Sequence, residues 1–318
     1  MRIGVLSNRR AGKQGGRVGR VLQLAASDPS IVHVETDSAS AVPEALLALA
    51  RQGVDVLAVN GGDGTLQRAL TSLLRDRPFE SLPWVAPLRS GRTNMAAIDL
   101  GATRNPTRGL QALVRAAASR SLEARAVRRP VLQVQLGPRR ELHVGMFFGT
   151  GVVFRTIQTI HTAFPPGNAR GALGGGLMIA MLVVQAARRH MEGILSADKM
   201  QIQLDGEPLG FGEYSLVMAT SLRRLFLGIR PFWGREARPV RFTAISSQPD
   251  RVSAAAVGIL RGRPRGFVTP EKGYTSRNVN SAQLNLHCGL TIDGELFEPE
   301  ADRIVRVEAD RGIRFVRA

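Results

Sequence analysis

The residues best suited to chemistry in this chain form a glycine-rich hexapeptide, NGGDGT, at positions 60–65. It follows a nearly all-apolar run at 54–60 and precedes a segment with helical spacing at 66–74. Glycines let backbone N–H groups approach phosphate oxygens closely, and the N-terminus of a following helix adds partial positive charge. The charge of Asp63 is wrong for phosphate, so this side chain is expected to face Mg²⁺ or to accept a proton from a hydroxyl. A tight turn with an aspartate cap would use the same residues, but the strand–loop–helix order favours a phosphate-binding loop.

Two further polar loops follow apolar runs of the same kind. One reads SNRRAGK at 7–13 and the other LRSGRTN at 88–94. Both carry the small, polar and basic residues that a polyphosphate site needs, although each alone is typical of a surface turn. The carboxyl ends of parallel strands meet at one edge of a sheet, where α/β folds bind their ligands. The three loops together therefore predict one phosphate-binding site.

The elements around these loops alternate between strand-like and helix-like patterns. Strands are expected at 2–7, 31–35, 54–60 and 84–88, and helices at 18–26, 42–51, 66–74 and 106–118. Such alternation is typical of a parallel sheet with right-handed crossovers. It predicts an N-terminal three-layer α/β nucleotide-binding domain over residues 1–125.

After residue 125 the pattern changes to short strands separated by turn residues. Strands are expected at 131–136, 142–148, 201–204, 214–219, 240–245, 266–268, 282–286 and 304–308. This spacing predicts a C-terminal antiparallel β-sandwich domain over residues 126–318. A helical insertion at 152–191 interrupts it.

Composition excludes several classes of protein. With 318 residues, 44% hydrophobic and 22% charged, the chain fits two globular domains and not a disordered chain. The single cysteine, Cys288, excludes an intramolecular disulfide and a CxxC metal site. The N-terminus lacks a signal-peptide core, and the longest uncharged stretch, 171–187, is shorter than the ~20 apolar residues of a membrane span. We therefore expect a cytoplasmic protein, with peripheral attachment to the inner face of the membrane.

The formal net charge of +17 attracts polyanions such as nucleotide phosphates, anionic lipid or nucleic acid, although arginine-rich composition also follows codon bias. Residues 222–265 hold ten arginines against two acids, together with Phe226, Phe232 and Trp233. Basic residues mixed with exposed aromatics suit a membrane surface or stacked single-stranded nucleic acid. A solvated strand face is the plainer interpretation.

The loops resemble the catalytic domain of diacylglycerol kinases, which is shared with sphingosine kinases and bacterial soluble lipid kinases. The GGDGT loop at 61–65 is the family's hallmark, and its Asn-Pro-x-Ser-Gly loop corresponds to 8–12, where Pro and Ser are lost. The family's Gly-Thr-x-Asn-Asp loop corresponds to 91–95. There Arg92 replaces the first threonine and Met95 the aspartate. The family's Asp-Gly-Glu near the C-terminus corresponds to 293–295.

The resemblance implies a kinase that uses ATP and Mg²⁺, with Glu295 accepting the proton of the lipid hydroxyl. Asp293 would support metal or base, and Asp63 would meet the Mg²⁺ bound to ATP. Arg92 would offset phosphate charge, and the second domain would supply the lipid acceptor site. The nucleotide-binding residues implied are Asn8, Ala11, Gly12, Thr36, Gly61, Gly62, Asp63, Gly64, Thr65, Gly91, Arg92, Thr93 and Asn94.

Three other stretches could carry a functional role or a purely structural one. A second Asp-Gly-Glu at 205–207 reads as a hairpin turn. The stretch 235–239 corresponds to a turn that holds a structural Mg²⁺ in many lipid kinases, but it lacks the required aspartates and glycine. The apolar stretch 173–184 would line a lipid site or pack as a core helix.

Three functions therefore remain open. The leading one is a lipid kinase acting on a diacylglycerol-like or sphingoid alcohol at a membrane surface, with anionic phospholipid as partner and no nucleic acid. The second is a kinase of a soluble acceptor, because NAD kinases also use a GGDG loop. The third is a basic membrane-binding protein whose kinase site has decayed. Arg92 and Met95 favour this interpretation, because they replace a threonine and an aspartate of the family's loop.

Overall fold

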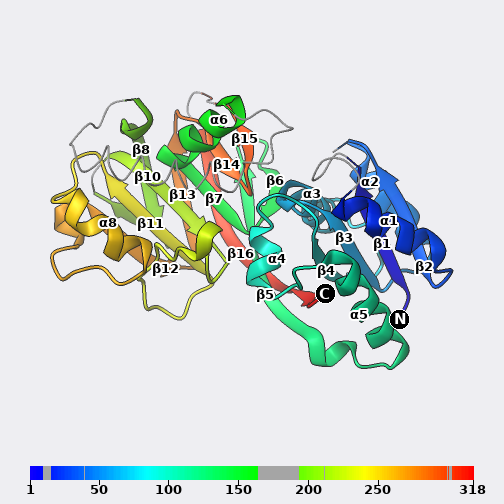
Figure 1. Ribbon diagram of the computed structural model, residues 1–318. Coiled ribbons are helices and arrows are strands. Elements are labelled where there is room, and N and C mark those ends of the chain that lie inside the picture. Colours follow the sequence, from blue (N-terminus) through cyan, green and yellow to red (C-terminus); the bar gives the residue numbers. More distant parts are fainter. Residues whose placement is uncertain (10–15, 39, 164–192, 211, 299, 301–302) are drawn as a thin grey trace. The chain divides into compact units, whose positions relative to one another are not determined.

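The computed structural model describes residues 1–9, 16–38, 40–163, 193–210, 212–298, 300 and 303–318 (Figure 1). The chain forms two compact units. Unit 1 comprises Met1–Val131, His143–Gly145 and Arg311–Ala318, and unit 2 comprises Leu132–Leu142 and Met146–Asp310. The chain therefore returns to unit 1 at its C-terminus, a feature that the sequence pattern does not reveal.

Unit 1 is built on a parallel sheet, as expected. Its strands follow the order β2 (Ile31–Thr36), β1 (Ile3–Asn8), β3 (Val56–Gly61), β4 (Trp84–Arg89), and the end of β16 (Arg303–Val316) pairs in parallel with β4. The helices are α1 (Arg17–Ser27), α2 (Val42–Arg51), α3 (Asp63–Arg75), α4 (Met95–Asp99) and α5 (Pro106–Ala118). The three-layer α/β prediction is confirmed.

The alternation of side chains along the strands explains the layers. Val56 and Ala58 of β3 belong to one buried cluster with residues of α1 and α5. On the opposite face of the sheet, Gly4 of β1 leaves room for Leu49 of α2. β3 is buried along its whole length, as its apolar run predicts for a strand covered on both faces.

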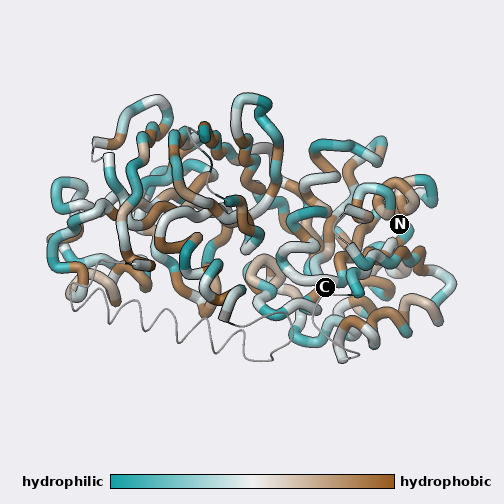
Figure 2. The backbone as a smooth tube through the Cα atoms, turned by 90° about the horizontal axis from the view of Figure 1, so that it is seen from above, coloured by the Kyte–Doolittle hydropathy of each residue, from teal (hydrophilic) through white to brown (hydrophobic). Residues whose placement is uncertain are grey.

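Unit 2 is an antiparallel sandwich. One sheet has the order β15-β14-β7-β10-β11-β12 and the other β9-β8-β13-β16-β5-β6, and β10 also pairs with β8 over two residue pairs. The strands are β5 (Ala126–Leu136), β6 (Glu141–Gly145), β7 (Phe147–Gly151), β8 (Asp198–Leu204), β9 (Glu207–Leu209), β10 (Glu213–Thr220), β11 (Val240–Ser246), β12 (Tyr274–Val279), β13 (Ser281–Leu286), β14 (Leu290–Ile292) and β15 (Glu295–Phe297). One buried cluster takes residues from both sheets, and Figure 2 shows hydrophobic and hydrophilic positions interleaved along the strands. The predicted β-sandwich is therefore confirmed.

Several elements differ from expectation. The strand expected at 266–268 is a turn, and the strand expected at 142–148 is divided into β6 and β7. Helix α8 (Val252–Leu260) was not expected, because its sequence is apolar all round and lacks an amphipathic period. The expected insertion begins with α6 (Val152–Ala163), whereas its remainder, including 173–184, lies outside the described residues. Among the helices of the described ranges, none has the length and hydropathy of a membrane span.

Candidate functional site

The glycine loop connects a buried strand to a long helix in unit 1. β3 ends at Gly61, Gly62 adopts an extended conformation, and α3 begins at Asp63. The first-turn N–H groups of Asp63, Gly64 and Thr65 cannot bond within the helix. Such a helix end binds anions through its free N–H groups and its partial positive charge. The loop thus has the strand–loop–helix geometry that the sequence predicts.

Close packing explains two of the glycines, Gly61 against the Thr65 side chain and Gly91 against the Gly62 backbone. A Cβ at Gly61 would lie 2.5 Å from the Cβ of Thr65, and a Cβ at Gly91 would overlap the Cα of Gly62. A Cβ at Gly62, by contrast, would meet the Cα of Gly91 at an ordinary 3.5 Å. The glycine loop and the loop after β4 therefore touch through bare backbone.

These contacts predict different effects on stability for alanine substitutions at Gly91 and at Gly62, which face each other across the two loops. Gly91→Ala should destabilise the fold by about 1–3 kcal/mol through overpacking, which differential scanning calorimetry would detect. Gly62→Ala should leave the melting temperature nearly unchanged but weaken binding of a fluorescent ATP analogue, because its methyl group would shield the phosphate-facing backbone. Equal melting temperatures for both variants would contradict the packing.

Asp63 joins the same two loops. Its Oδ2 accepts the N–H of Met95 at 3.0 Å and its Oδ1 accepts the N–H of Ala96 at 3.1 Å. Burial raises the pKa of Asp63, and the bonds from the backbone oppose that rise. The carboxylate thus caps α4 and orders the loop before it, with a small pocket beside it lined by Gly61, Gly62 and Asn94.

Asn94 closes the loop after β4. This residue has a φ of 50°, and its Oδ1 accepts the N–H of Gly91 while its Nδ2 donates to the carbonyl of Gly91, both at 2.7 Å. Arg92 and Thr93 are exposed at the tip. Both are therefore available to a ligand, whereas Asn94 orders the loop.

The other predicted nucleotide residues lie at the ends of β1 and β2. Asn8 Nδ2 donates to Thr65 Oγ1 at 3.1 Å, which links the first loop to the glycine loop. Thr36 is buried, and its hydroxyl donates to the carbonyl of Ser7 at 3.4 Å. Ala11 and Gly12 lie outside the described residues. The structure thus brings the ends of β1 and β3 together as expected.

Sequence reasoning missed a polar cluster on the other face of these strand ends. Asn60 Nδ2 donates to Ser7 Oγ at 2.9 Å, and His33 Nε2 lies 3.2 Å from the same oxygen. Asn60 Oδ1 is buried and has no partner within the described part of the chain. The signal was present in the sequence, because Asn60 directly precedes the glycines.

Burial lowers the pKa of His33 from its ordinary value of 6.5, against the opposing effect of Glu35. The unfolded chain therefore binds a proton more readily than the folded protein, and stability falls as the pH drops through 6.5. His33→Gln should reduce the difference in melting temperature between about pH 7.5 and pH 5.5, measured by circular dichroism. The same change at exposed His161 should leave that difference as it is, and an unchanged difference in His33→Gln would refute the assignment.

The Asp-Gly-Glu at 293–295 lies in unit 2, in the turn between β14 and β15. Asp293 has a φ of 49°, and its two carboxylate oxygens accept the N–H groups of Met146 and Phe147, each at 2.9 Å. Glu295 is half-buried at the first position of β15. Asp293 therefore anchors the hairpin that presents Glu295.

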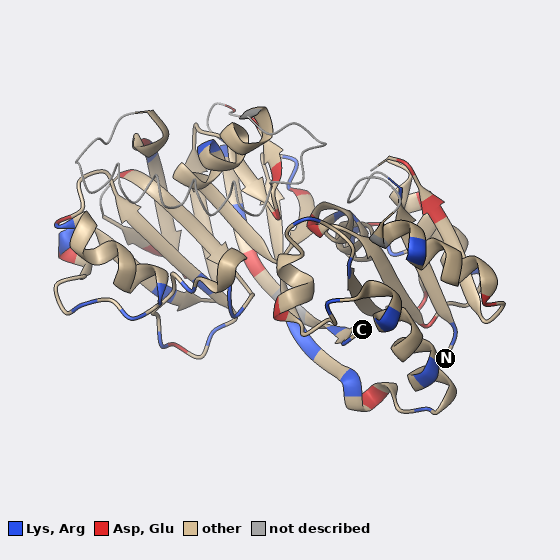
Figure 3. Cartoon of the chain, viewed as in Figure 1, with Lys and Arg blue, Asp and Glu red and all other residues tan. Residues whose placement is uncertain are grey.

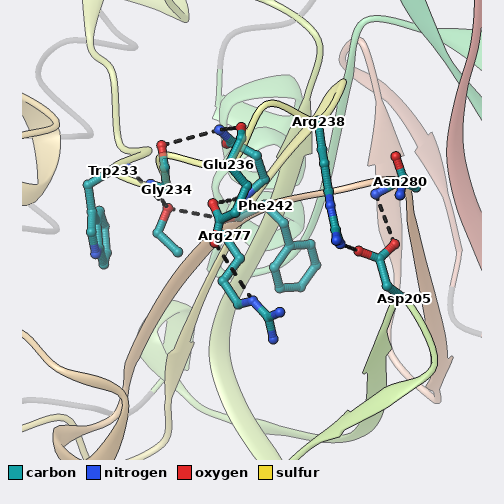
Figure 4. Close-up of polar contacts among 10 residues, drawn as sticks. Asp205, Trp233, Gly234, Glu236, Arg238, Phe242, Arg277 and Asn280 are labelled. Carbon is teal, nitrogen blue, oxygen red and sulfur yellow. Dashed lines mark hydrogen bonds and ion pairs between the residues drawn. The ribbon is translucent and has the colours of Figure 1, made fainter.

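The second Asp-Gly-Glu forms a turn of the same design. Asp205 has a φ of 51° between β8 and β9, its Oδ1 accepts the N–H groups of Asn280 and Ser281 at 2.9 Å each, and its Oδ2 pairs with Arg238 (Figure 4). The hairpin interpretation is confirmed here. Two backbone bonds to an aspartate therefore do not by themselves mark a catalytic residue.

The stretch 235–239 is held by protein groups. Glu236 accepts the N–H of Asn278 at 2.9 Å, and Asn278 Nδ2 donates to the carbonyl of Glu236 at 2.7 Å (Figure 4). Arg238 pairs with Asp205. Throughout the described ranges, no group of three or more His, Cys, Asp or Glu residues could hold a metal.

The donor set of unit 1 fits a nucleotide better than a resident metal. The first turn of α3 and the bare glycine backbone offer N–H donors at the loop, whereas the buried Asn60 Oδ1 is an acceptor and does not suit an anionic phosphate. Mg²⁺ in kinases is held chiefly by substrate phosphates with one or two carboxylates. Asp63, which was expected to meet that ion, instead uses both carboxylate oxygens to accept the N–H groups of Met95 and Ala96.

Comparison with known proteins agrees with this geometry. The family model of the diacylglycerol kinase catalytic domain matches residues 2–124, while the curated proteins gave no match. A putative diacylglycerol kinase from Bacillus anthracis str. Sterne is similar in structure, with a TM-score of 0.68, 16% identity, and coverage of 100% of this chain and 97% of that chain. Yeast NADH kinase complexed with NADH is also similar, with a TM-score of 0.51, 11% identity, and coverage of 100% and 84%.

At these identities the solved structures show the fold, and the family model is the stronger finding. It covers all three loops described above, including the glycine loop at 61–65. Residues 2–124 therefore match the model of the diacylglycerol kinase catalytic domain family.

Proposed function

We propose that the protein is an ATP-dependent lipid kinase that transfers the γ-phosphate of ATP to the hydroxyl of a diacylglycerol-like or sphingoid lipid. The observation that carries the proposal is the glycine loop, fixed by Asp63 to the loop at 91–96 within the residues that match the diacylglycerol kinase catalytic domain. Phosphoryl transfer depends on positioning and electrostatics more than on covalent chemistry. A rigid pair of loops at a helix N-terminus serves that need.

The nucleotide would be held by the first turn of α3, by Gly62 and by the exposed loop tip. ATP supplies the phosphoryl group, and Mg²⁺ offsets charge on its phosphates. Arg92, exposed at the tip, would add positive charge where negative charge develops on the phosphates during transfer. Asn8 would keep the first loop in register through its bond to Thr65.

Glu295 would accept the proton of the lipid hydroxyl. A carboxylate is a suitable base for an alcohol that becomes a nucleophile, and such bases contribute about 10²–10⁴ to the rate. Asp293 would act by positioning, because its two oxygens already accept backbone N–H groups.

A kinase of a soluble acceptor is the second candidate. The structural similarity to yeast NADH kinase favours it, because both chains share the fold. The Asp-Gly-Glu at 293–295 favours a lipid acceptor, because it is one of the motifs by which the chain resembles lipid kinases.

The test is an incubation of the purified protein with Mg²⁺ and γ-labelled ATP. The acceptors are mixed micelles containing diacylglycerol or sphingosine, a panel of soluble alcohols, and NAD. Label in the organic phase, lost in Glu295→Gln, is the expected result. Label in the aqueous phase alone would favour the soluble acceptor, and no label with any acceptor would refute the kinase.

A further inference from the structure

An exposed turn at 225–229 in unit 2 presents a leucine to solvent in an unfavourable conformation. Leu227 has a φ of 56° and is 60% exposed. The turn is closed by bonds from Leu225 N to Ile229 O at 2.8 Å and from Gly228 N to Leu225 O at 2.9 Å. A left-handed backbone is costly for a bulky residue, and such outliers concentrate at functional positions. The fold thus holds an apolar side chain outward at a position where glycine would be easier.

Exposed arginines surround this turn. Arg223 and Arg224 precede it and Arg230 follows it. The N–H of Arg230 donates to the carbonyl of Leu260 at 2.8 Å, which places the end of α8 beside the turn. Within the described ranges, no ion pair involves Arg230 or the arginines at 261 and 263. Figure 3 shows basic residues in the loops that flank α8.

Helix α8 adds a second exposed apolar residue. Its inner side packs Ala255 and Ile259 against Val268 and Tyr274, whereas Val257 is 51% exposed. Arg261 lies one helical turn after Val257, and its N–H donates to the carbonyl of Val257 at 3.3 Å. The outer side of α8 is therefore apolar next to cationic groups.

We propose that Leu227, Val257 and the exposed arginines at 223, 224, 230, 261 and 263, here called the Leu227 patch, dock on an anionic phospholipid bilayer. Guanidinium groups bind phosphodiesters through paired hydrogen bonds, and apolar side chains enter the boundary between headgroups and acyl chains. This inference rests on the proposed function, because a kinase that acts on a bilayer lipid must meet its substrate at the membrane surface.

The exposure of the aromatic residues favours a bilayer over nucleic acid. Single-stranded nucleic acid is bound by stacking bases on exposed aromatic rings. Phe226, Phe232 and Trp233 are only partly exposed, and the more exposed apolar side chains of the patch, Leu227 and Val257, are aliphatic. The sequence-based expectation of exposed aromatics is therefore corrected.

Co-sedimentation with vesicles tests the proposal directly. The wild-type protein should bind vesicles of phosphatidylcholine with 30% phosphatidylglycerol, and hardly bind pure phosphatidylcholine. Arg261→Gln with Arg263→Gln should weaken binding about thirtyfold. The matched control is Arg108→Gln with Arg115→Gln on α5, which removes two exposed arginines from unit 1 and should change binding less than threefold.

Leu227→Gly separates docking from folding. Glycine accepts the positive φ without strain, so the melting temperature should stay the same or rise. Vesicle binding should weaken about tenfold, because the inserting side chain is gone. Weakened binding with a lowered melting temperature would instead indicate a structural role for Leu227.

Activity on a short-chain, water-soluble diacylglycerol separates this inference from the proposed function. The arginine variants should phosphorylate that monomeric substrate as well as the wild-type does. Absence of lipid kinase activity with intact vesicle binding would refute the function and keep the docking surface. Equal loss of binding in both arginine pairs, or binding of a single-stranded oligonucleotide in place of anionic vesicles, would overturn the docking surface.

Discussion

Replacing Glu295 with glutamine is expected to lower phosphotransfer about 10²–10⁴-fold while leaving the fold intact. Glutamine has nearly the same shape but cannot take a proton from the acceptor hydroxyl, and a general base contributes a factor of this size. Glu295 is half-buried at the start of β15. The measurement is the initial rate with labelled ATP and a lipid acceptor, together with the affinity for ATP, which should stay unchanged.

The chain supplies a matched control for this substitution. Glu207 is the glutamate of the other Asp-Gly-Glu turn and holds the same first position in β9. Glu207→Gln should retain nearly full activity, because that hairpin serves only as a turn. Equal effects of both substitutions would show that the activity loss comes from a disturbed hairpin and would remove Glu295 from catalysis.

Replacing Asp63 with asparagine is expected to cost both stability and activity. The amide offers one acceptor oxygen where the carboxylate offers two, so the N–H of Met95 or of Ala96 loses its partner. An unpaired buried N–H costs about 1–3 kcal/mol. Displacing the two loops by about 1 Å would lower phosphotransfer about a hundredfold. Thermal unfolding, binding of an ATP analogue and initial rates measure the three effects.

Asp205→Ala is the matching control for stability. Asp205 Oδ1 accepts two backbone N–H groups and its Oδ2 pairs with Arg238, so alanine leaves both N–H groups without this partner. The substitution should lower stability at least as much as Asp63→Asn but leave ATP binding intact. If Asp205→Ala also abolished ATP binding, the effect of Asp63→Asn would be one of general destabilisation.

The elements of unit 1 could be predicted because each has a local pattern. A strand buried on both faces reads as a continuous apolar run, and α5 begins at Pro106 with Asn105 as its cap. Unit 2 was harder. α8 is apolar all round, and β12 alternates weakly because four of its six residues, at 275–278, are polar. Neither carries a period that identifies its type without its neighbours.

The nucleotide loops could be located from sequence, but their internal roles could not. Asp63 was expected to face Mg²⁺ or a hydroxyl, and the structure shows its oxygens on the backbone of Met95 and Ala96. Sequence also left Asn60 without a role, although its Oδ1 is buried and unpartnered within the described residues. A motif gives residue types in order, whereas hydrogen-bond partners depend on which backbone groups the fold leaves unpaired.

The sequence by itself determined strands β1 to β4 and helices α1, α2, α3 and α5 of unit 1. It also determined the three glycine-containing loops and the placement of the Asp-Gly-Glu turns, because periodicity and turn chemistry act over a few residues. Tertiary structure decided that Gly91 abuts Gly62, that Asp63 caps α4 and that Leu227 faces solvent among arginines. The contacts of Gly91 and of Asp63 join residues about 30 positions apart in the chain. They arise only when parallel strands align their carboxyl ends and bring separate loops together.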